Sequence, residues 1–215
     1  MKNIQLQASL DPAASALLII DMQNDFLHRE GYFARRGLAV EVLQPTIAAT
    51  RDLRDKLPSL VRVVYTVQLY EPDGSDDIVR IHHIKPAGLV RLGREIPVAR
   101  GGWGAEIVTE LQPRSQDVVL AKRRFDAFHQ TNLELLLRSW GIKTLLFAGV
   151  IADVCVETSM RSAFVRDFDV VLARDCVASW KKEYLDRTAD VVDRAFGICM
   201  SNAEITTLSS GQFAI

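Results

Sequence analysis

Three side chains that can take part in nucleophilic chemistry follow short apolar runs in separate parts of the sequence. Asp21 directly follows the first run, Lys122 follows a second, and Cys155 comes shortly after a third. A thiolate is a nucleophile, a carboxylate can take up and return its proton, and a nearby ammonium group stabilises both anions. Together, these residue types point to covalent catalysis by a cysteine.

Cys155 stands where an expected strand leads into an expected helix. A thiol in the first helical turn faces unpaired backbone N–H groups and the positive end of the helix dipole, which lower its pKa from about 8.5. A neighbouring Lys122 would lower this pKa further. The alternative is an inert buried cysteine that packs as a small apolar side chain.

Asp21 and Lys122 each have a structural alternative. Asp21 is expected at a partly dry strand end, where burial raises the pKa of its carboxyl group and a nearby ammonium lowers it. There it would take the thiol proton and later deliver it to a leaving amine. Asp21 is equally suited to a turn or a helix cap. Lys122 precedes Arg123 and Arg124, and such a basic run is commonly a solvated surface.

Short apolar runs alternate with segments of helical spacing, which predicts an α/β fold with an open parallel sheet and helices on both faces. Such runs are typical of strands buried on both faces. The predicted strands are Ser15–Asp21, Val61–Val67, Asp117–Ala121, Thr144–Val150 and Asp169–Ala173. The predicted helices are Val40–Leu57, Thr131–Trp140 with a capping box of Thr131 and Glu134, Asp153–Phe168 and Lys182–Phe196. Ligands of such sheets bind beyond the carboxyl ends of the strands, where the three reactive side chains are expected to meet.

The 215 residues are expected to form one domain over 1–215, with an irregular insertion at about 70–102 that closes a site or joins subunits. Lys and Arg number 26 against 27 Asp and Glu, which gives no electrostatic case for nucleic acid or an anionic membrane as partner. Three cysteines form no disulfide framework. With no targeting segment seen, we expect a cytoplasmic protein.

Three blocks of the sequence resemble the signature blocks of the isochorismatase-like cysteine hydrolases. They are Asp21–Phe26 (DMQNDF), Lys122–Phe128 (KRRFDAF) and Gly149–Thr158 (GVIADVCVET). The resemblance runs in order from about Ser15 to Asn202. It implies a catalytic triad of Asp21, Lys122 and Cys155, whose thiolate attacks an amide or ureide carbonyl. Ammonia or an amine then leaves, and water hydrolyses the thioester.

The resemblance also implies a cis peptide bond between Val150 and Ile151. This bond would direct the N–H group of Ile151, together with that of Cys155, at the oxyanion that develops on the substrate. Loss of one such donor typically costs about 10²–10³ in rate. One departure from the family pattern is Ala152, where a threonine is frequent.

The branches of the family differ in features that this chain has or lacks. Nicotinamidases carry a metal-binding Asp-x-His pattern after the second strand, which is missing from Thr66–Pro72, and His82 and His83 are taken as loop residues. We therefore expect no metal and no cofactor. Isochorismatases proper often lack the cysteine. The resemblance is strongest to the ureide-cleaving members, which act on ureidoacrylate, biuret, triuret or N-carbamoyl amino acids.

Other functions remain open at this point. A vinyl-ether hydrolase and a nicotinamidase-like amidase are alternatives within the family. A catalytically silent binding domain with Cys155 as a redox-sensing thiol is an alternative of another class.

Several residues are predicted to contact the substrate. Phe26 and Phe125 are predicted apolar walls of the pocket, and Gln68 is a predicted polar contact, although each is also suited to packing. Four arginines are unranked candidates for binding a substrate carboxylate: Arg91, Arg94, Arg100 and Arg124. Cys176 and Cys199 are interpreted as structural. The resemblance implies a homodimer or homotetramer.

Overall fold

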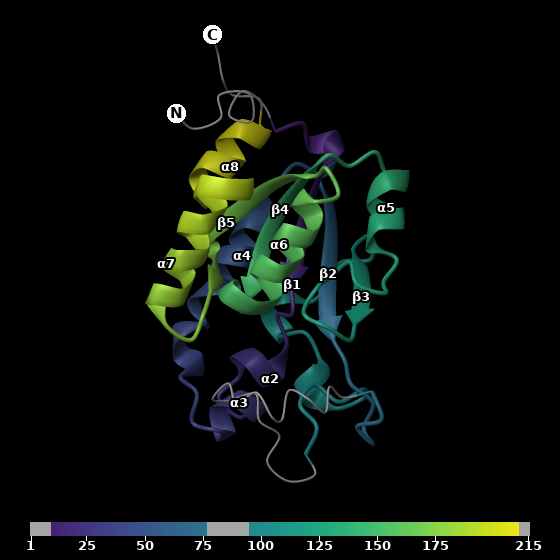
Figure 1. Ribbon diagram of the computed structural model, residues 1–215, viewed down its shortest axis with the longest axis vertical. Helices are drawn as coiled ribbons and strands as arrows, with labels where there is room; N and C mark the ends of the chain where they lie inside the picture. The colour runs from purple at the N-terminus through teal and green to yellow at the C-terminus, as the bar shows by residue number, and fades with distance from the viewer. Residues whose placement is uncertain (1–9, 77–94, 211–215) are drawn as a thin grey trace.

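A sheet of parallel strands forms the centre of the molecule (Figure 1). The computed structural model describes residues 10–76 and 95–210. Within these residues the strand order is β3-β2-β1-β4-β5-β6, and every neighbouring pair is parallel. The strands are β1 (Ser15–Ile20), β2 (Arg62–Gln68), β3 (Val118–Lys122), β4 (Thr144–Val150), β5 (Asp169–Ala178) and β6 (Ile198–Met200).

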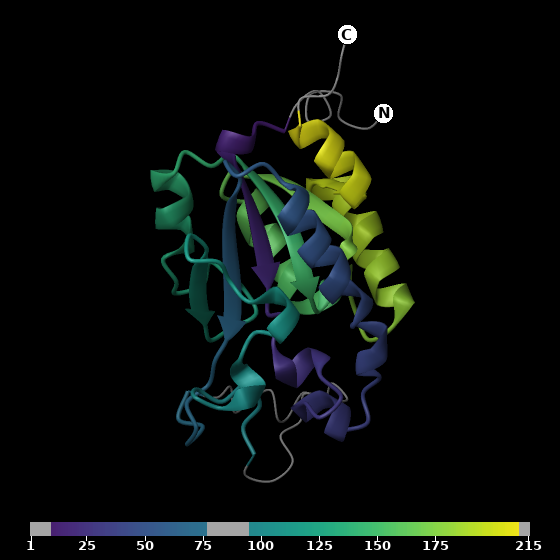
Figure 2. The same ribbon diagram turned by 180° about the vertical axis from the view of Figure 1, so that it is seen from behind.

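Helices cover both faces of the sheet, which confirms the predicted fold class (Figures 1 and 2). On one face lie α4 (Pro45–Lys56) and α8 (Asn202–Ser209). On the other lie α5 (Leu133–Ser139), α6 (Glu157–Phe164) and α7 (Lys182–Val191). The two short helices α2 (Asn24–Leu27) and α3 (Tyr32–Arg35) lie beyond the carboxyl end of the sheet.

Single turns of 3-10 or π helix complete the described secondary structure. The 3-10 turns are Pro12–Ala14, Val40–Val42, Trp103–Ala105 and Thr109–Leu111, and the π turns are Ala152–Val156 and Val192–Phe196.

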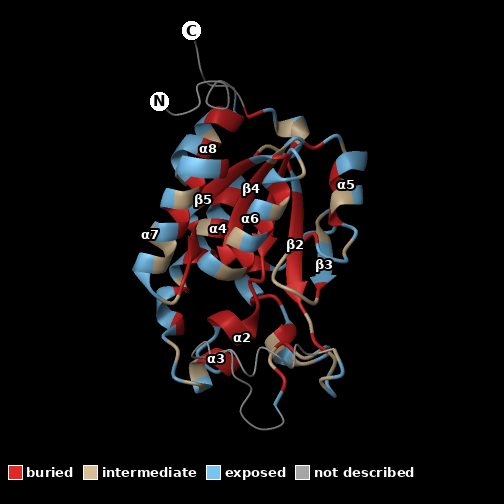
Figure 3. Cartoon of the chain, in the orientation of Figure 1, coloured by how far each residue is buried: buried red, intermediate tan, exposed pale blue. Residues whose placement is uncertain are grey.

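The central strands are apolar because both of their faces are covered. The central strands of the sheet are coloured as buried in Figure 3, and all six residues of β1 are buried. Side chains that alternate along β1 enter two separate hydrophobic clusters, one on each face. The edge strand β3 differs from the prediction of burial on both faces. Its Val119 is 48% exposed, and β3 lies at the edge of the sheet, where it pairs only with β2.

Several predicted boundaries move in the structure. The helix predicted from Val40 begins at Pro45, a residue suited to the first helical position. The capping box predicted at Thr131 does not form: the Thr131 hydroxyl donates to Ala127 O, and Glu134 pairs with Arg166. A capping box does occur at Ser201 and Glu204, where it starts α8.

The two described ends of the predicted insertion lie side by side. Tyr70 and Ala99 form a parallel bridge, and the Tyr70 carbonyl accepts a hydrogen bond from Arg100 N at 2.8 Å. Arg100 Nε also donates to Glu71 Oε1 at 3.1 Å. His82, His83, Arg91 and Arg94 lie outside the described residues. Among the helices that the structure describes, none has the length and apolar character needed to cross a membrane.

Candidate active site

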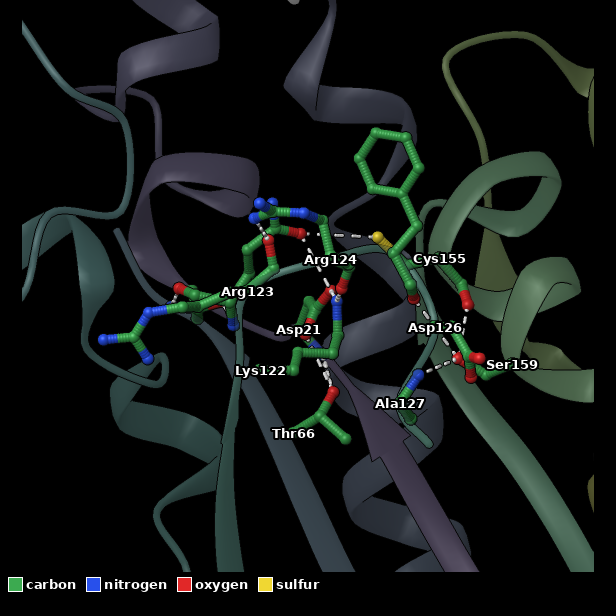
Figure 4. Close-up of polar contacts among 12 residues, drawn as sticks. Asp21, Thr66, Lys122, Arg123, Arg124, Asp126, Ala127, Cys155 and Ser159 are labelled. Atoms are coloured by element: carbon green, nitrogen blue, oxygen red, sulfur yellow. Dashed lines mark hydrogen bonds and ion pairs between the residues drawn. The ribbon is translucent and has the colours of Figure 1, made fainter. Parts of the chain in front are cut away.

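The carboxyl ends of β1, β3 and β4 bring Asp21, Lys122 and Cys155 together (Figure 4). Lys122 Nζ lies 2.7 Å from Asp21 Oδ2, and both side chains are fully buried. Cys155 is buried in the π turn that follows β4. These three side chains are the reactive ones that the sequence places after separate apolar runs.

Asp21 is fixed by the neighbouring strand β2. Thr66 Oγ1 donates to Asp21 Oδ1 at 2.8 Å, and Asp21 N donates to Thr66 O at 3.1 Å. Asp21 has a φ of 51°, in the left-handed region that aspartate tolerates better than most residues. This conformation ends β1 and directs the carboxylate across β2 toward Lys122.

Lys122 is a buried cation, not a member of a solvated basic run. Its Nζ donates to Arg124 O at 3.0 Å and to Gln68 Oε1 at 3.3 Å, in addition to its pairing with Asp21. Burial opposes the charge, but interactions led by the carboxylate of Asp21 outweigh it and raise the pKa of Lys122 above its ordinary value. Arg123 instead points outward and pairs with Glu71 and Asp76.

Burial raises the pKa of the Cys155 thiol, which corrects the prediction that its position would lower this pKa. Lys122 opposes the increase, and the carboxylate of Asp21 adds to it. The predicted dipole effect does not prevail because Cys155 lies in a dry site, in a π turn that precedes α6. The resting group is therefore a thiol that needs a base before it can attack.

Gly149 lets β4 approach β1 closely just before the cysteine. Its φ is 114°, and a Cβ atom at this position would lie 2.1 Å from Ile20 O. Only glycine fits such an approach without moving the backbone. The peptide bond between Val150 and Ile151 is cis, as the family resemblance implies.

Ser159 of α6 ties the cysteine turn to the segment that follows Lys122. Its hydroxyl donates to Cys155 O at 2.7 Å and accepts a hydrogen bond from Ala127 N at 2.9 Å (Figure 4). The side chain is fully buried. The second and third sequence blocks are thus joined by one hydroxyl group, which sequence reasoning did not single out.

The polar residues after Asp21 hold the loops around the site, a role that the sequence analysis missed. Gln23 Nε2 donates to Gln68 O at 3.0 Å and to Ala105 O at 2.8 Å. Asp25 accepts hydrogen bonds from Tyr32 N and Val98 N at 2.9 and 2.7 Å. The only signal was a cluster of amide and carboxylate side chains at the end of a buried strand.

Comparisons with known proteins show the family to which this chain belongs. The isochorismatase domain model matches residues 15–204. The chain belongs to the isochorismatase family. It is a hydrolase of that family, and its resemblance to the family is confirmed.

Among similar proteins of this family are ureidoacrylate amidohydrolases named RutB. The one from Serratia proteamaculans is 33% identical over 171 residues, which cover 75% of this chain and 69% of the relative. The one from Rhizobium rhizogenes is 29% identical and covers 88% of this chain and 80% of the relative.

Solved structures of similar proteins share the fold. An isochorismatase family protein from Desulfovibrio vulgaris has a TM-score of 0.77 at 27% identity, covering 92% of this chain and 98% of that one. N-carbamoylsarcosine amidase from Thermoplasma acidophilum has a TM-score of 0.71 at 26% identity, covering 87% and 96%.

The residues predicted to contact substrate occupy different settings in this isochorismatase-family fold. Gln68 is buried, and its Oε1 accepts hydrogen bonds from both Lys122 and Cys155. Phe26 is buried and stacks on Phe33 with ring centroids 5.0 Å apart, while Phe125 is half-buried. The described residues contain no cluster of three or more His, Cys, Asp and Glu side chains able to hold a metal ion.

Proposed function

We propose that the protein is a cysteine-dependent amidohydrolase that cleaves a C–N bond of a small ureide or carbamoyl amide. The observation that carries this proposal is the fully buried ion pair of Asp21 and Lys122 beside the Cys155 thiol. The RutB relatives and N-carbamoylsarcosine amidase support the substrate class, since their names specify amide or ureide hydrolysis.

In the first half-reaction Asp21 acts as the base. As Cys155 Sγ bonds to the substrate carbonyl carbon, the thiol proton passes to the Asp21 carboxylate, and the carbonyl oxygen takes up the electron pair. The N–H groups of Ile151 and Cys155 donate to this oxyanion. When the carbonyl reforms, the C–N bond breaks, and the leaving nitrogen takes the proton from Asp21. Ammonia or an amine departs, and a thioester remains on Cys155.

In the second half-reaction water replaces the amine. Asp21 removes a proton from water as its oxygen bonds to the thioester carbon, and the C–S bond then breaks. The departing sulfur takes the proton back from Asp21, which restores the starting enzyme. Lys122 stays protonated throughout and stabilises the anions of Asp21 and Cys155 in turn.

The substrate contacts of this proposal remain those predicted from sequence. Phe26 and Phe125 form apolar walls, and Gln68 supplies a polar contact. The half-buried position of Phe125, which packs against the cluster containing Cys155, supports its part. We also propose that the enzyme acts without metal or cofactor and assembles as a homodimer or homotetramer.

Ammonia release by the purified protein tests the proposal. The substrates are biuret, triuret, ureidoacrylate, N-carbamoyl amino acids, nicotinamide and simple amides. Cys155→Ser is the inactive variant, and Cys199→Ser is the matched control, because Cys199 lies outside the site beside Ala189. We expect release from one ureide or carbamoyl amide by the wild type and Cys199→Ser, and none by Cys155→Ser.

Other outcomes of this panel would reject the proposal. Release from nicotinamide alone would favour the nicotinamidase-like alternative. No release by a folded, fully reduced protein would favour the vinyl-ether alternative, which hydrolysis of isochorismate would then test. Undiminished release by Cys155→Ser would exclude the cysteine mechanism.

A further inference from the structure

The side chain of Gln68 faces the cysteine with its oxygen. Gln68 is the last residue of β2, the strand that lies between β1 with Asp21 and β3 with Lys122. Its Oε1 accepts from Lys122 Nζ at 3.3 Å and from Cys155 Sγ at 3.6 Å, and the residue is only 4% exposed. One amide oxygen therefore contacts both the ammonium group and the thiol.

Lys122 and Tyr70 hold the two ends of this amide. The Lys122 ammonium can only donate, so it keeps Gln68 Oε1 on the side of Cys155, and Gln68 Nε2 donates to Tyr70 OH at 2.6 Å on the other side. The backbone of Gln68 is fixed separately by Gln23, which accepts from Gln68 N at 2.9 Å and donates to Gln68 O at 3.0 Å. The backbone of Gln68 is thus fixed by Gln23, and Tyr70 anchors the NH2 end of its side chain.

We propose that Tyr70 is a positioning residue that acts through Gln68 to keep an amide oxygen against Cys155, which holds the thiol protonated until substrate arrives. The proposal rests on the proposed function, because it takes Cys155 as the nucleophile. In this proposal Gln68 acts on Cys155 before the substrate binds. This role is additional to its predicted contact with the substrate.

The direction of this effect follows from the charges around the sulfur. An amide oxygen accepts a hydrogen bond from S–H but repels a thiolate, so its presence favours the thiol. The ionisable groups that act on Cys155 are Lys122 from β3 and Asp21 from β1, while Tyr70 acts on Lys122. Asp153 of the same turn accepts a hydrogen bond from Ser179 instead.

Loss of the Tyr70 hydroxyl frees the NH2 end of the amide, with one consequence for the thiol. The side chain is then held only by Lys122 and its oxygen moves away from Cys155. This change removes an acceptor from S–H, so the pKa of the Cys155 thiol falls.

The test is the rate at which iodoacetamide alkylates Cys155, measured against pH by mass spectrometry of the peptide that contains it. Near neutral pH we expect Tyr70→Phe to react about three- to tenfold faster than wild type, as a pKa lower by up to about one unit requires. The alkylation profile should move to lower pH. A merely loosened structure would also raise the rate, and the opposite signs expected for two variants of Gln68 separate these explanations.

Variants of Gln68 test the same oxygen without changing Tyr70. Gln68→Leu removes the oxygen and should move the profile in the same direction as Tyr70→Phe. Gln68→Glu replaces the amide by an anion and should move it to higher pH, with slower alkylation near neutral pH. Electrostatics requires the two Gln68 variants to shift the alkylation profile in opposite directions. A general loss of stability would shift both profiles in the same direction.

Tyr65→Phe is the matched control. Tyr65 is also a buried tyrosine, on β2, but its hydroxyl bonds to Arg54 at 2.8 Å, away from the site. We expect its alkylation profile to match that of wild type. An alkylation profile of Tyr70→Phe equal to that of wild type would overturn the proposal. If Tyr70→Phe does not fold, profiles of Gln68→Leu and Gln68→Glu that shift in the same direction would overturn it instead. Alkylation needs no substrate. A negative ammonia assay would therefore reject the proposed function, while the alkylation profiles would still decide whether Tyr70 and Gln68 act on the Cys155 thiol.

Discussion

Lys122 and Asp21 form a buried ion pair although β2 lies between β3 and β1, the strands that carry them. The sheet alone does not bring the two charges together. Asp21 reaches Lys122 because it leaves β1 in the left-handed conformation and is held by Thr66 of the intervening strand. Each charge therefore depends on the other for its stability in the core.

Asp21→Asn should remove activity and destabilise the fold. The variant leaves the Lys122 cation buried without its anion, a change that typically costs about 3–5 kcal/mol. It also removes the proposed base, and we expect ammonia release to fall by at least about 10²-fold. The double variant Asp21→Asn/Lys122→Met should recover stability but not activity. Urea unfolding and turnover of each variant check this, and a double variant as unstable as the single one would contradict it.

Stability should fall at alkaline pH because of buried thiols. Burial raises the pKa of Cys155, and it raises that of Cys176 to about 12 from an ordinary 9.0. The unfolded chain loses these protons first, so the stabilisation is complete below the unfolded pKa and is lost as pH rises toward the folded pKa. The loss is about 1.4 kcal/mol per pH unit for each thiol.

Cys176→Ser tests this linkage outside the active site. Its free energy of unfolding should decline less steeply than that of wild type above pH 9.0, the ordinary thiol pKa. Urea unfolding at several pH values below about 10.4 avoids the titration of lysine in the unfolded chain. Parallel slopes for the two proteins would show that Cys176 contributes nothing to the pH dependence.

Gly149→Ala should be among the most damaging single changes. The added Cβ would meet Ile20 O at 2.1 Å, and the φ of 114° is unfavourable for alanine. We expect a loss of more than about 3 kcal/mol, beyond the usual range for single substitutions. Gly141→Ala is the matched control, because its φ is 71° but nothing lies within 4 Å of its Cβ position. It should cost only about 1–2 kcal/mol, and similar losses in thermal or urea unfolding for the two variants would refute the steric explanation.

Ser159→Ala should weaken the link between two parts of the site. It leaves the Ala127 N–H group buried without its acceptor, which typically costs about 1–3 kcal/mol. The carbonyl of Cys155 also loses a donor, so we expect turnover to decrease as well. Ser139→Ala removes an exposed hydroxyl of α5 and should be neutral by both urea unfolding and ammonia release. A Ser159→Ala protein as stable as Ser139→Ala would rule out this role.

Local sequence patterns predicted the buried strands well, since an apolar run that enters a covered sheet has few alternatives. The strand Thr144–Val150 has the predicted bounds. The patterns did not reveal that β3 is an edge strand, because its sequence resembles that of a central one. They also missed β6, which has only three residues, and the extension of β5 past Ala173, where the pairing with β4 shifts register.

The sequence by itself determined the fold class and the residue types at the strand ends, and its three blocks indicated the isochorismatase family. Only the tertiary structure decided that Lys122 is buried while Arg123 is not, and that Gln68 contacts both Lys122 and Cys155. It also decided that burial raises the pKa of Cys155. The physical reason is that periodicity and chain order are local properties. Desolvation and side-chain contacts depend on every segment packed around a group, and these segments come from distant parts of the chain.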